Sequence, residues 1–129
     1  MKAIMLVSLC VCVLMGGCKA PSPIVEPNCP ITVRVDQKSD MKTIITRAAV
    51  RRRWSAVEIQ PGVIRCTLLN RQHEVQVDVV YTDTHFEIRY VNSRNMDYDA
   101  RQKTISRKYN QWVRNLEREI LLQFSRASL

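Results

Sequence analysis

Three consecutive segments of this chain alternate apolar and polar residues, and no other sequence feature limits the possible folds as strongly. They cover residues 63–70, 73–82 and 85–90. Successive side chains of a strand point to opposite faces of its sheet, so each segment places one apolar row and one polar row. Short connections at Arg71-Gln72 and Asp83-Thr84 join the segments. We therefore predict an antiparallel meander with one buried face and one face in water.

The remaining elements complete one domain in a chain of 129 residues, of which 46% are hydrophobic. Apolar residues on one helical face predict a helix from residue 41 to about 53, and the stripe from Ile105 to Ile120 predicts a longer terminal helix. Alternation predicts strands at 31–35 and 55–60. The order is then β-α-β-β-β-β-α. We predict a single α+β domain over residues 31–129, a two-layer sandwich in which two helices cover one face of the antiparallel meander sheet.

The first residues resemble the signal of a bacterial lipoprotein. Lys2 precedes an apolar run from Ala3 to Met15, which is shorter than the about 20 residues of a membrane helix. Leu14-Met15-Gly16-Gly17-Cys18 is similar to the lipobox, although the usual Leu is replaced by Met15. The resemblance implies that residues 1–17 are cleaved and that Cys18 carries the lipid. The alternative is an ordinary cleaved signal that contains a Cys.

Residues 18–30 are predicted to be a tether between the lipid and the domain. The stretch holds four of the five prolines and has no helical or strand periodicity, so it is expected to be extended. By the sorting rule of enteric lipoproteins, Lys19 in place of Asp favours the outer membrane over the inner one. We therefore expect a domain tethered to the periplasmic face of the outer membrane and held clear of the headgroups.

Two cysteines besides Cys18 remain after cleavage, Cys29 and Cys66. An oxidising periplasm permits a disulfide between them. Cys29 comes just before the first expected strand and Cys66 lies inside a later one, so a bridge is geometrically possible. The alternative is that Cys66 is a buried apolar residue and Cys29 a free thiol, and the sequence leaves both open.

Basic residues dominate the charge, with 20 Lys+Arg against 12 Asp+Glu and a net charge of +8. The densest run is Arg51-Arg52-Arg53, with Arg47 one turn earlier. Cations complement the dipole at a helix C-terminus. On a membrane-tethered protein they also suit anionic lipid headgroups, lipopolysaccharide phosphates or an acidic protein, so these four residues form the candidate binding patch. A secretory signal excludes nucleic acid, the usual partner of such a charge.

Few residues offer catalytic chemistry. His73 and His85 are expected on opposite sheet faces, which argues against a shared metal, and a set of Cys29, Cys66 and His73 lacks the close ligand pairs of zinc sites. We expect no metal and no cofactor. A nucleophilic pair of Cys66 and His73 requires an exposed thiol beside a positioned base, whereas Cys66 is expected mid-strand on the core face.

Other polar and aromatic residues have simpler interpretations. Trp54 and Trp112 are expected in the core. Carboxylates on an open sheet face with arginines among them favour cross-strand ion pairs over acid–base catalysis. The carboxylates expected on the outward face are Glu58, Glu74, Asp78 and Glu87.

Three motifs resemble a recurrent group of small bacterial lipoproteins, over about residues 40 to 122. They are Arg53-Trp54 at a helix end, Ile88-x-Tyr90, and Tyr109-Asn110-x-Trp112-Val113-x-Asn115-Leu116-Glu117. The resemblance implies the fold and the cellular place, and it implies no biochemical activity. We interpret the terminal-helix motif as a packing signature.

The sequence therefore favours a non-enzymatic lipoprotein, anchored in the membrane through Cys18. Its domain is expected to be a binding or assembly module for an envelope protein or an anionic envelope component. One alternative is a small periplasmic hydrolase or thiol enzyme that uses Cys66 or His73, and another is a structural spacer. A pocket with a perturbed thiol or histidine would favour the enzyme.

Overall fold

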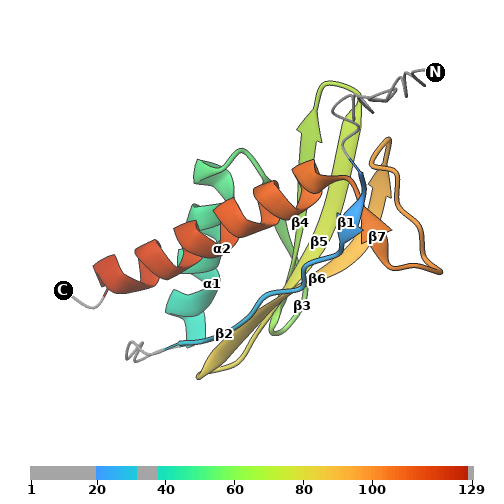
Figure 1. Cartoon of the computed structure of the whole chain (residues 1–129). Coiled ribbons are helices and arrows are strands. Elements are labelled where there is room, and N and C mark those ends of the chain that lie inside the picture. Colours follow the sequence, from blue (N-terminus) through green and yellow to red (C-terminus); the bar gives the residue numbers. More distant parts are fainter. Residues whose placement is uncertain (1–19, 32–37, 128–129) are drawn as a thin grey trace, which may run out of the picture.

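The computed structural model describes residues 20–31 and 38–127, in which two helices pack on one face of an antiparallel sheet (Figure 1). The predicted two-layer α+β sandwich is confirmed. The signal peptide, Cys18 and most of the strand expected at 31–35 lie outside the described residues.

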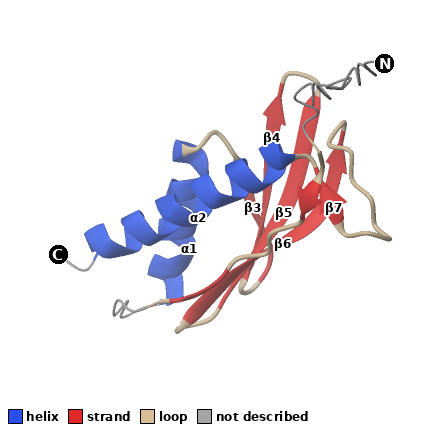
Figure 2. Cartoon of the chain, viewed as in Figure 1, coloured by secondary structure: helices blue, strands red, loops and turns tan. Residues whose placement is uncertain are grey.

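The main sheet has five strands in the order β2-β6-β5-β4-β3, and each neighbouring pair is antiparallel. Its central part is the predicted meander. A second, two-stranded sheet pairs β1 with β7 (Figure 2). The strands are β1 Ser22–Pro23, β2 Asn28–Pro30, β3 Ser55–Gln60, β4 Val63–Asn70, β5 His73–Tyr81, β6 His85–Arg94 and β7 Thr104–Ile105.

The apolar rows of the meander form the floor of the core. Ile64, Val77 and Ile88 are fully buried under the helices, one from each central strand. The opposite face carries polar side chains, among them Arg65, which forms a bidentate ion pair with Asp78 on the neighbouring strand. The predicted difference between the two faces is confirmed.

Helix α1 (Lys38–Arg51) lies on the sheet, and α2 (Arg107–Ala127) crosses over it (Figure 1). The apolar stripe of α2 is buried, and each large apolar side chain removed from water stabilises the fold by about 1.5–3 kcal/mol. Both helices and strands β2 to β7 contribute side chains to one core, and a chain of residues 20–129 contains all of these elements. The buried stripe consists of Tyr109, Val113, Leu116, Ile120 and Phe124.

The tether predicted over residues 18–30 is wrong for the part that the structure describes. Ser22 pairs with Ile105 in the small sheet, and β2 pairs with the outer edge of β6. The segment is extended, as expected, but its backbone groups bond to the domain because they meet a sheet edge that has free partners. The domain therefore includes β1 and β2, which precede the start expected at residue 31, and Ala20, the first described residue, is two positions from Cys18 in the sequence.

Glu58 does not lie on the outward face, in contrast to the prediction. It pairs with Ile64 in the β3–β4 ladder, and residues directly opposite each other share a face. Its carboxylate meets Lys42 of α1, with Nζ 2.7 Å from Oε2. Val57 and Ile59 take the outward positions instead, with exposures of 62% and 45%. The prediction fails because a short edge strand carries a weak alternation.

Candidate functional site

The C-terminal end of α1 holds an arginine in a strained backbone conformation. The N–H of Arg53 donates to the carbonyl of Val50 (3.0 Å), and the N–H of Trp54 donates to that of Ala49 (2.9 Å). This bond pattern is the Schellman motif, whose left-handed residue is usually glycine. Here that residue is Arg53, with φ of 67°. A non-glycine residue in this conformation costs about 1–2 kcal/mol.

The arginine hollow lies between this turn and α2. Trp54 is buried and anchors the turn to the core, whereas Trp112 on α2 is half-buried and forms the opposite wall. The space has a volume of about 210 Å³, with aromatic and apolar walls and a rim of guanidinium groups. It is lined by Arg51, Arg52, Arg53, Trp54, Leu68, Trp112 and Asn115.

The three arginines of the rim differ in their partners. Arg51 donates through Nε to Oε1 of Glu119 on α2 at 2.7 Å, and Glu119 is only 5% exposed. Arg51 thus neutralises a buried carboxylate. Arg52 and Arg53 are exposed and form no ion pair within the described part of the chain. Two guanidinium groups therefore remain free to pair with a carboxylate or phosphate, which they match in a bidentate geometry.

The predicted patch of four arginines is divided by the structure. Arg47 does not line the arginine hollow and instead borders a groove on the outer side of α1, with Lys42 and Val50 among its neighbours. Arg47 and Arg51 share a helix face, whereas Arg52 and Arg53 form the turn that ends the helix. The prediction placed Arg47 with Arg52 and Arg53 because it assumed a continuous helix, whereas the helix ends before Arg52.

The disulfide considered between Cys29 and Cys66 does not form, and both are free thiols. Cys29 lies on β2 and Cys66 on β4, with β6 and β5 between them. Three strand spacings place them roughly 14 Å apart, whereas bridged Cα atoms lie within about 7 Å. The sequence could not show that β2 pairs at the far edge of the sheet.

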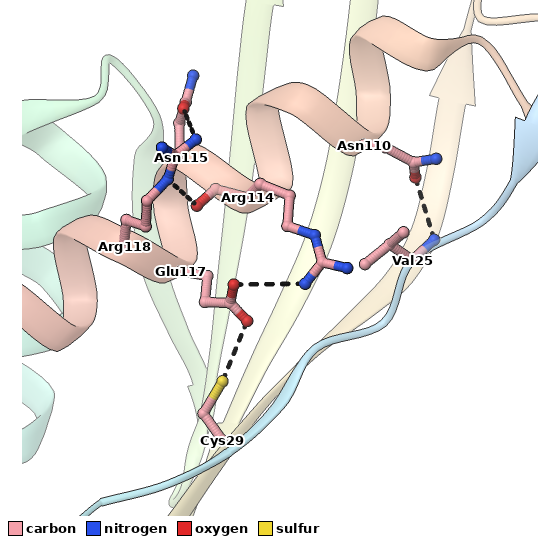
Figure 3. A network of polar contacts seen from close by, with 7 residues as sticks. All are labelled: Val25, Cys29, Asn110, Arg114, Asn115, Glu117 and Arg118. Carbon is pink, nitrogen blue, oxygen red and sulfur yellow. Dashed lines mark hydrogen bonds and ion pairs between the residues drawn. The ribbon is translucent and has the colours of Figure 1, made fainter.

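Neither thiol has the environment of a nucleophile. The Cys29 Sγ donates to Oε2 of Glu117 at 3.1 Å, and Glu117 also pairs with Arg114 (Figure 3). Burial and this hydrogen bond raise the pKa of Cys29 to about 12. Cys66 is fully buried, which raises its pKa to about 12 as well.

His73 lies far from Cys66, whereas His85 stands opposite Pro30, next to Cys29 on β2 but at a position of the other sheet face. Nδ1 of His73 is 2.8 Å from the carbonyl oxygen of Asn95, and its ring lies 6.2 Å from that of Trp112. Cys66 stands opposite Val77, four residues along β5 from His73 and so roughly 13 Å away. The structure thus does not bring Cys66 and His73 together. Over residues 20–31 and 38–127, no group of three or more His, Cys, Asp or Glu residues is arranged to hold a metal ion.

A second hollow, of about 430 Å³, lies at the opposite end of the sheet and includes Lys42, Glu58 and Tyr81 in its lining. Sequence reasoning missed it because Glu58 was expected on the other face. The Lys42–Glu58 ion pair occupies the charge of both groups, and burial with the nearby Glu58 raises the pKa of Tyr81. Among the described residues that line this hollow, no cation lacks a partner, so the arginine hollow is the better candidate for an anionic ligand.

Comparison of the chain with models of known protein families, with curated proteins and with solved structures finds no match. Within the described residues, neither helix is long and apolar enough to cross a membrane. The candidate site therefore rests on the geometry of the arginine hollow.

Proposed function

We propose that this chain is a lipid-anchored periplasmic protein, held in the outer membrane through Cys18, and that its domain is a non-catalytic binding module. The arginine hollow binds an anionic group of an envelope component. The lipobox-like sequence around Cys18 supports the anchor. The observation that carries the binding role is the left-handed Arg53 at the rim of the hollow.

Arg53 supports this role because its position is unfavourable for the fold alone. Glycine would complete the same helix end with less strain. Strained residues cluster at functional sites, where the surrounding structure holds them in place. The arginine brings a second uncompensated charge next to Arg52 at the mouth of the hollow.

The walls of the arginine hollow suit a small anionic group. Arg52 and Arg53 offer paired N–H donors, and the Trp112 ring offers an apolar wall. Asn115 accepts a hydrogen bond from Arg118 at Oδ1 (2.9 Å; Figure 3), which leaves its amide nitrogen as a further donor. A carboxylate or phosphate group on a small apolar or sugar-like body matches this set of donors and walls.

A soluble chain of residues 20–129 tests the binding role in NMR titrations with glycerol phosphate and with acetate. We expect the Trp112 indole and Asn115 amide signals to shift on titration. The double variant Arg52→Glu/Arg53→Glu should lose these shifts, whereas the control Arg47→Glu/Arg126→Glu, with the same change in charge, should retain them. Arg51 stays unchanged because Glu119 depends on it. Equal shifts in both variants would contradict the proposal.

A second candidate partner is an envelope protein that adds a strand to the edge of β3. Strand β3 is the outer strand of the main sheet, and it exposes Val57 and Ile59. Extended peptides bind such edges through backbone hydrogen bonds. Immobilised residues 20–129 should then capture one envelope protein, and Val57→Lys/Ile59→Lys should abolish the capture. If the folded chain binds neither anions nor envelope proteins, a role as a structural spacer is the remaining interpretation.

A further inference from the structure

Six exposed cations gather at one end of the sandwich, which we call the basic end. None of them forms an ion pair in the part of the chain that the structure describes. At this end β4 turns into β5, β6 ends, β7 follows and α2 begins (Figure 1). The six residues are Arg52, Arg53, Arg71, Arg101, Lys103 and Arg107.

Contacts between the loops make the basic end one continuous surface. Nδ2 of Asn95 donates to the carbonyl of Gln72 in the β4–β5 turn (2.6 Å), and the same turn holds His73 against Trp112 at the arginine hollow. The N–H of Ser106, next to Arg107, donates to the carbonyl of Met96 (2.8 Å). The hollow, the β4–β5 turn and the start of α2 are therefore neighbours.

The cations at the opposite end of the sheet are paired instead. Lys42 meets Glu58 beside the β3–β4 turn, and Arg89 meets Glu87 near the β5–β6 turn. Asp83 adds a negative charge in that turn. The basic end also holds Asp97 and Asp99, in the connection from β6 to β7. Its six unpaired cations outnumber these two carboxylates, so among the described residues this end keeps a net positive charge and the opposite end does not.

Half of the cations at the basic end have a left-handed backbone. Arg53, Arg71 and Lys103 have φ angles of 67°, 57° and 52°. Side chains disfavour this conformation, and glycine or asparagine adopts it more readily. Arg107 is also unfavourable locally, because it lies in the first turn of α2, which contains no acidic residue. These charges thus occupy positions where the fold itself would favour other residues.

The N-terminal segment enters the domain at the same end. The N–H of Ile24 donates to the carbonyl of Lys103 (3.0 Å), and Ser22 pairs with Ile105. Residue 20 therefore lies at the basic end, two residues from Cys18. Two residues span at most about 7 Å, so a lipid on Cys18 would hold this end at the membrane surface.

We propose that the basic end is a membrane-binding face, which lies on anionic phospholipids and pairs its cations with their headgroup phosphates. This inference rests on the proposed lipid anchor at Cys18. It identifies the anion that reaches the arginine hollow as the phosphate of a lipid headgroup. A lipid anchor together with a basic surface gives stable and oriented attachment. Each Lys or Arg at an anionic surface strengthens binding roughly five-fold.

Vesicle sedimentation tests this face with the unlipidated chain of residues 20–129. Vesicles of phosphatidylcholine are compared with vesicles that also contain phosphatidylglycerol. We expect binding only to the anionic vesicles, and weaker binding at high salt. Lys103→Glu/Arg107→Glu should weaken it by roughly thirty-fold or more, whereas the charge-matched control Arg47→Glu/Arg126→Glu should bind nearly as well as the parent chain.

The same variants separate binding from folding. A glutamate at position 107 complements the dipole of α2, so the variant with weaker binding should unfold at an equal or higher urea concentration. Equal losses in both double variants would overturn the inference and indicate attraction by net charge alone. Loss in Arg52→Glu/Arg53→Glu only would confine lipid binding to the hollow and overturn the wider face.

Failure of the anchor is measured separately. Incorporation of labelled fatty acid into the full chain, abolished by Cys18→Ser, tests the lipid on Cys18. An unlabelled chain contradicts the anchored function whatever the vesicles show. A labelled chain whose domain ignores anionic vesicles overturns the membrane-binding face alone.

Discussion

Helix α2 contacts two polar regions of opposite character. On one side it holds the N-terminal segment of residues 20–31 through hydrogen bonds, as Figure 3 shows for Val25 with Asn110 and for Cys29 with Glu117. On the other side it borders the arginine hollow, where Arg52 and Arg53 form no ion pair within the described residues. Polar groups that bond to each other within the chain stabilise the fold, whereas exposed arginines without an ion pair are available to a ligand.

Replacing Arg51 by Ala should have the largest effect on stability. Arg51 lines the arginine hollow but belongs with the satisfied groups, because it neutralises the buried Glu119. Its loss leaves that carboxylate unpaired, which should lower the free energy of unfolding by about 2 kcal/mol, less than for a fully buried pair since Arg51 is half exposed. Urea denaturation measures the loss.

A second variant identifies the cause of that loss. Arg51→Ala/Glu119→Gln removes the unpaired charge and should recover most of the stability. If the double variant is no more stable than Arg51→Ala, the stabilisation comes from packing of the Arg51 side chain and not from its charge.

Replacing Asn110 by Ala should release the N-terminal segment. The Asn110 amide accepts from the N–H of Val25 and donates to Ser22 Oγ and the Pro23 carbonyl, at 2.8–3.0 Å. Three partly exposed hydrogen bonds contribute about 2 kcal/mol in total. Hydrogen exchange should rise at Val25 and remain slow in the central strand β5. Equal increases in both places would mean that Asn110 supports the whole fold.

The sequence predicted what depends on one-sided burial. Ile64, Val77 and Ile88 alternate with polar residues because one face of the sheet contacts helices and the other contacts water. The stripe of α2 repeats at helical spacing for the same reason. Such periods are local, so they can be read without knowing which segments meet.

Features that depend on contacts between distant segments could not be predicted in this way. The pairing of residues 28–30 requires a free edge on β6, and nothing in the proline-rich stretch itself indicates it. The arginine hollow needs the end of α1 to meet Trp112 and Asn115 on α2. Only the Arg-Arg-Arg run signalled the hollow, and its helical context wrongly included Arg47.

Replacing Arg53 by Gly should change stability and binding in opposite directions. Glycine adopts the φ of 67° without strain, so the variant should be about 1 kcal/mol more stable in urea. It also removes one of the two free guanidinium groups and should weaken the binding of glycerol phosphate. Arg53→Asn, which tolerates the same backbone, serves as a control without the charge. A glycine variant that binds as well as the parent would remove Arg53 from the site.

The smallest expected effect is a loss of stability at alkaline pH, which arises from Cys29 in the N-terminal segment. Burial and the bond to Glu117 raise the pKa of Cys29 from 9.0 to about 12, so the folded state holds the thiol proton more tightly than the unfolded state. Its contribution to stability is fully present below pH 9 and is lost as the pH rises toward about 12.

Alkylation of Cys29 should therefore lag behind that of a free thiol above pH 9 and accelerate in Glu117→Gln, which removes the carboxylate acceptor. Cys66, buried in the core, should stay unreactive in both proteins. Equal alkylation rates in the parent and in Glu117→Gln would show that Glu117 does not hold the thiol proton.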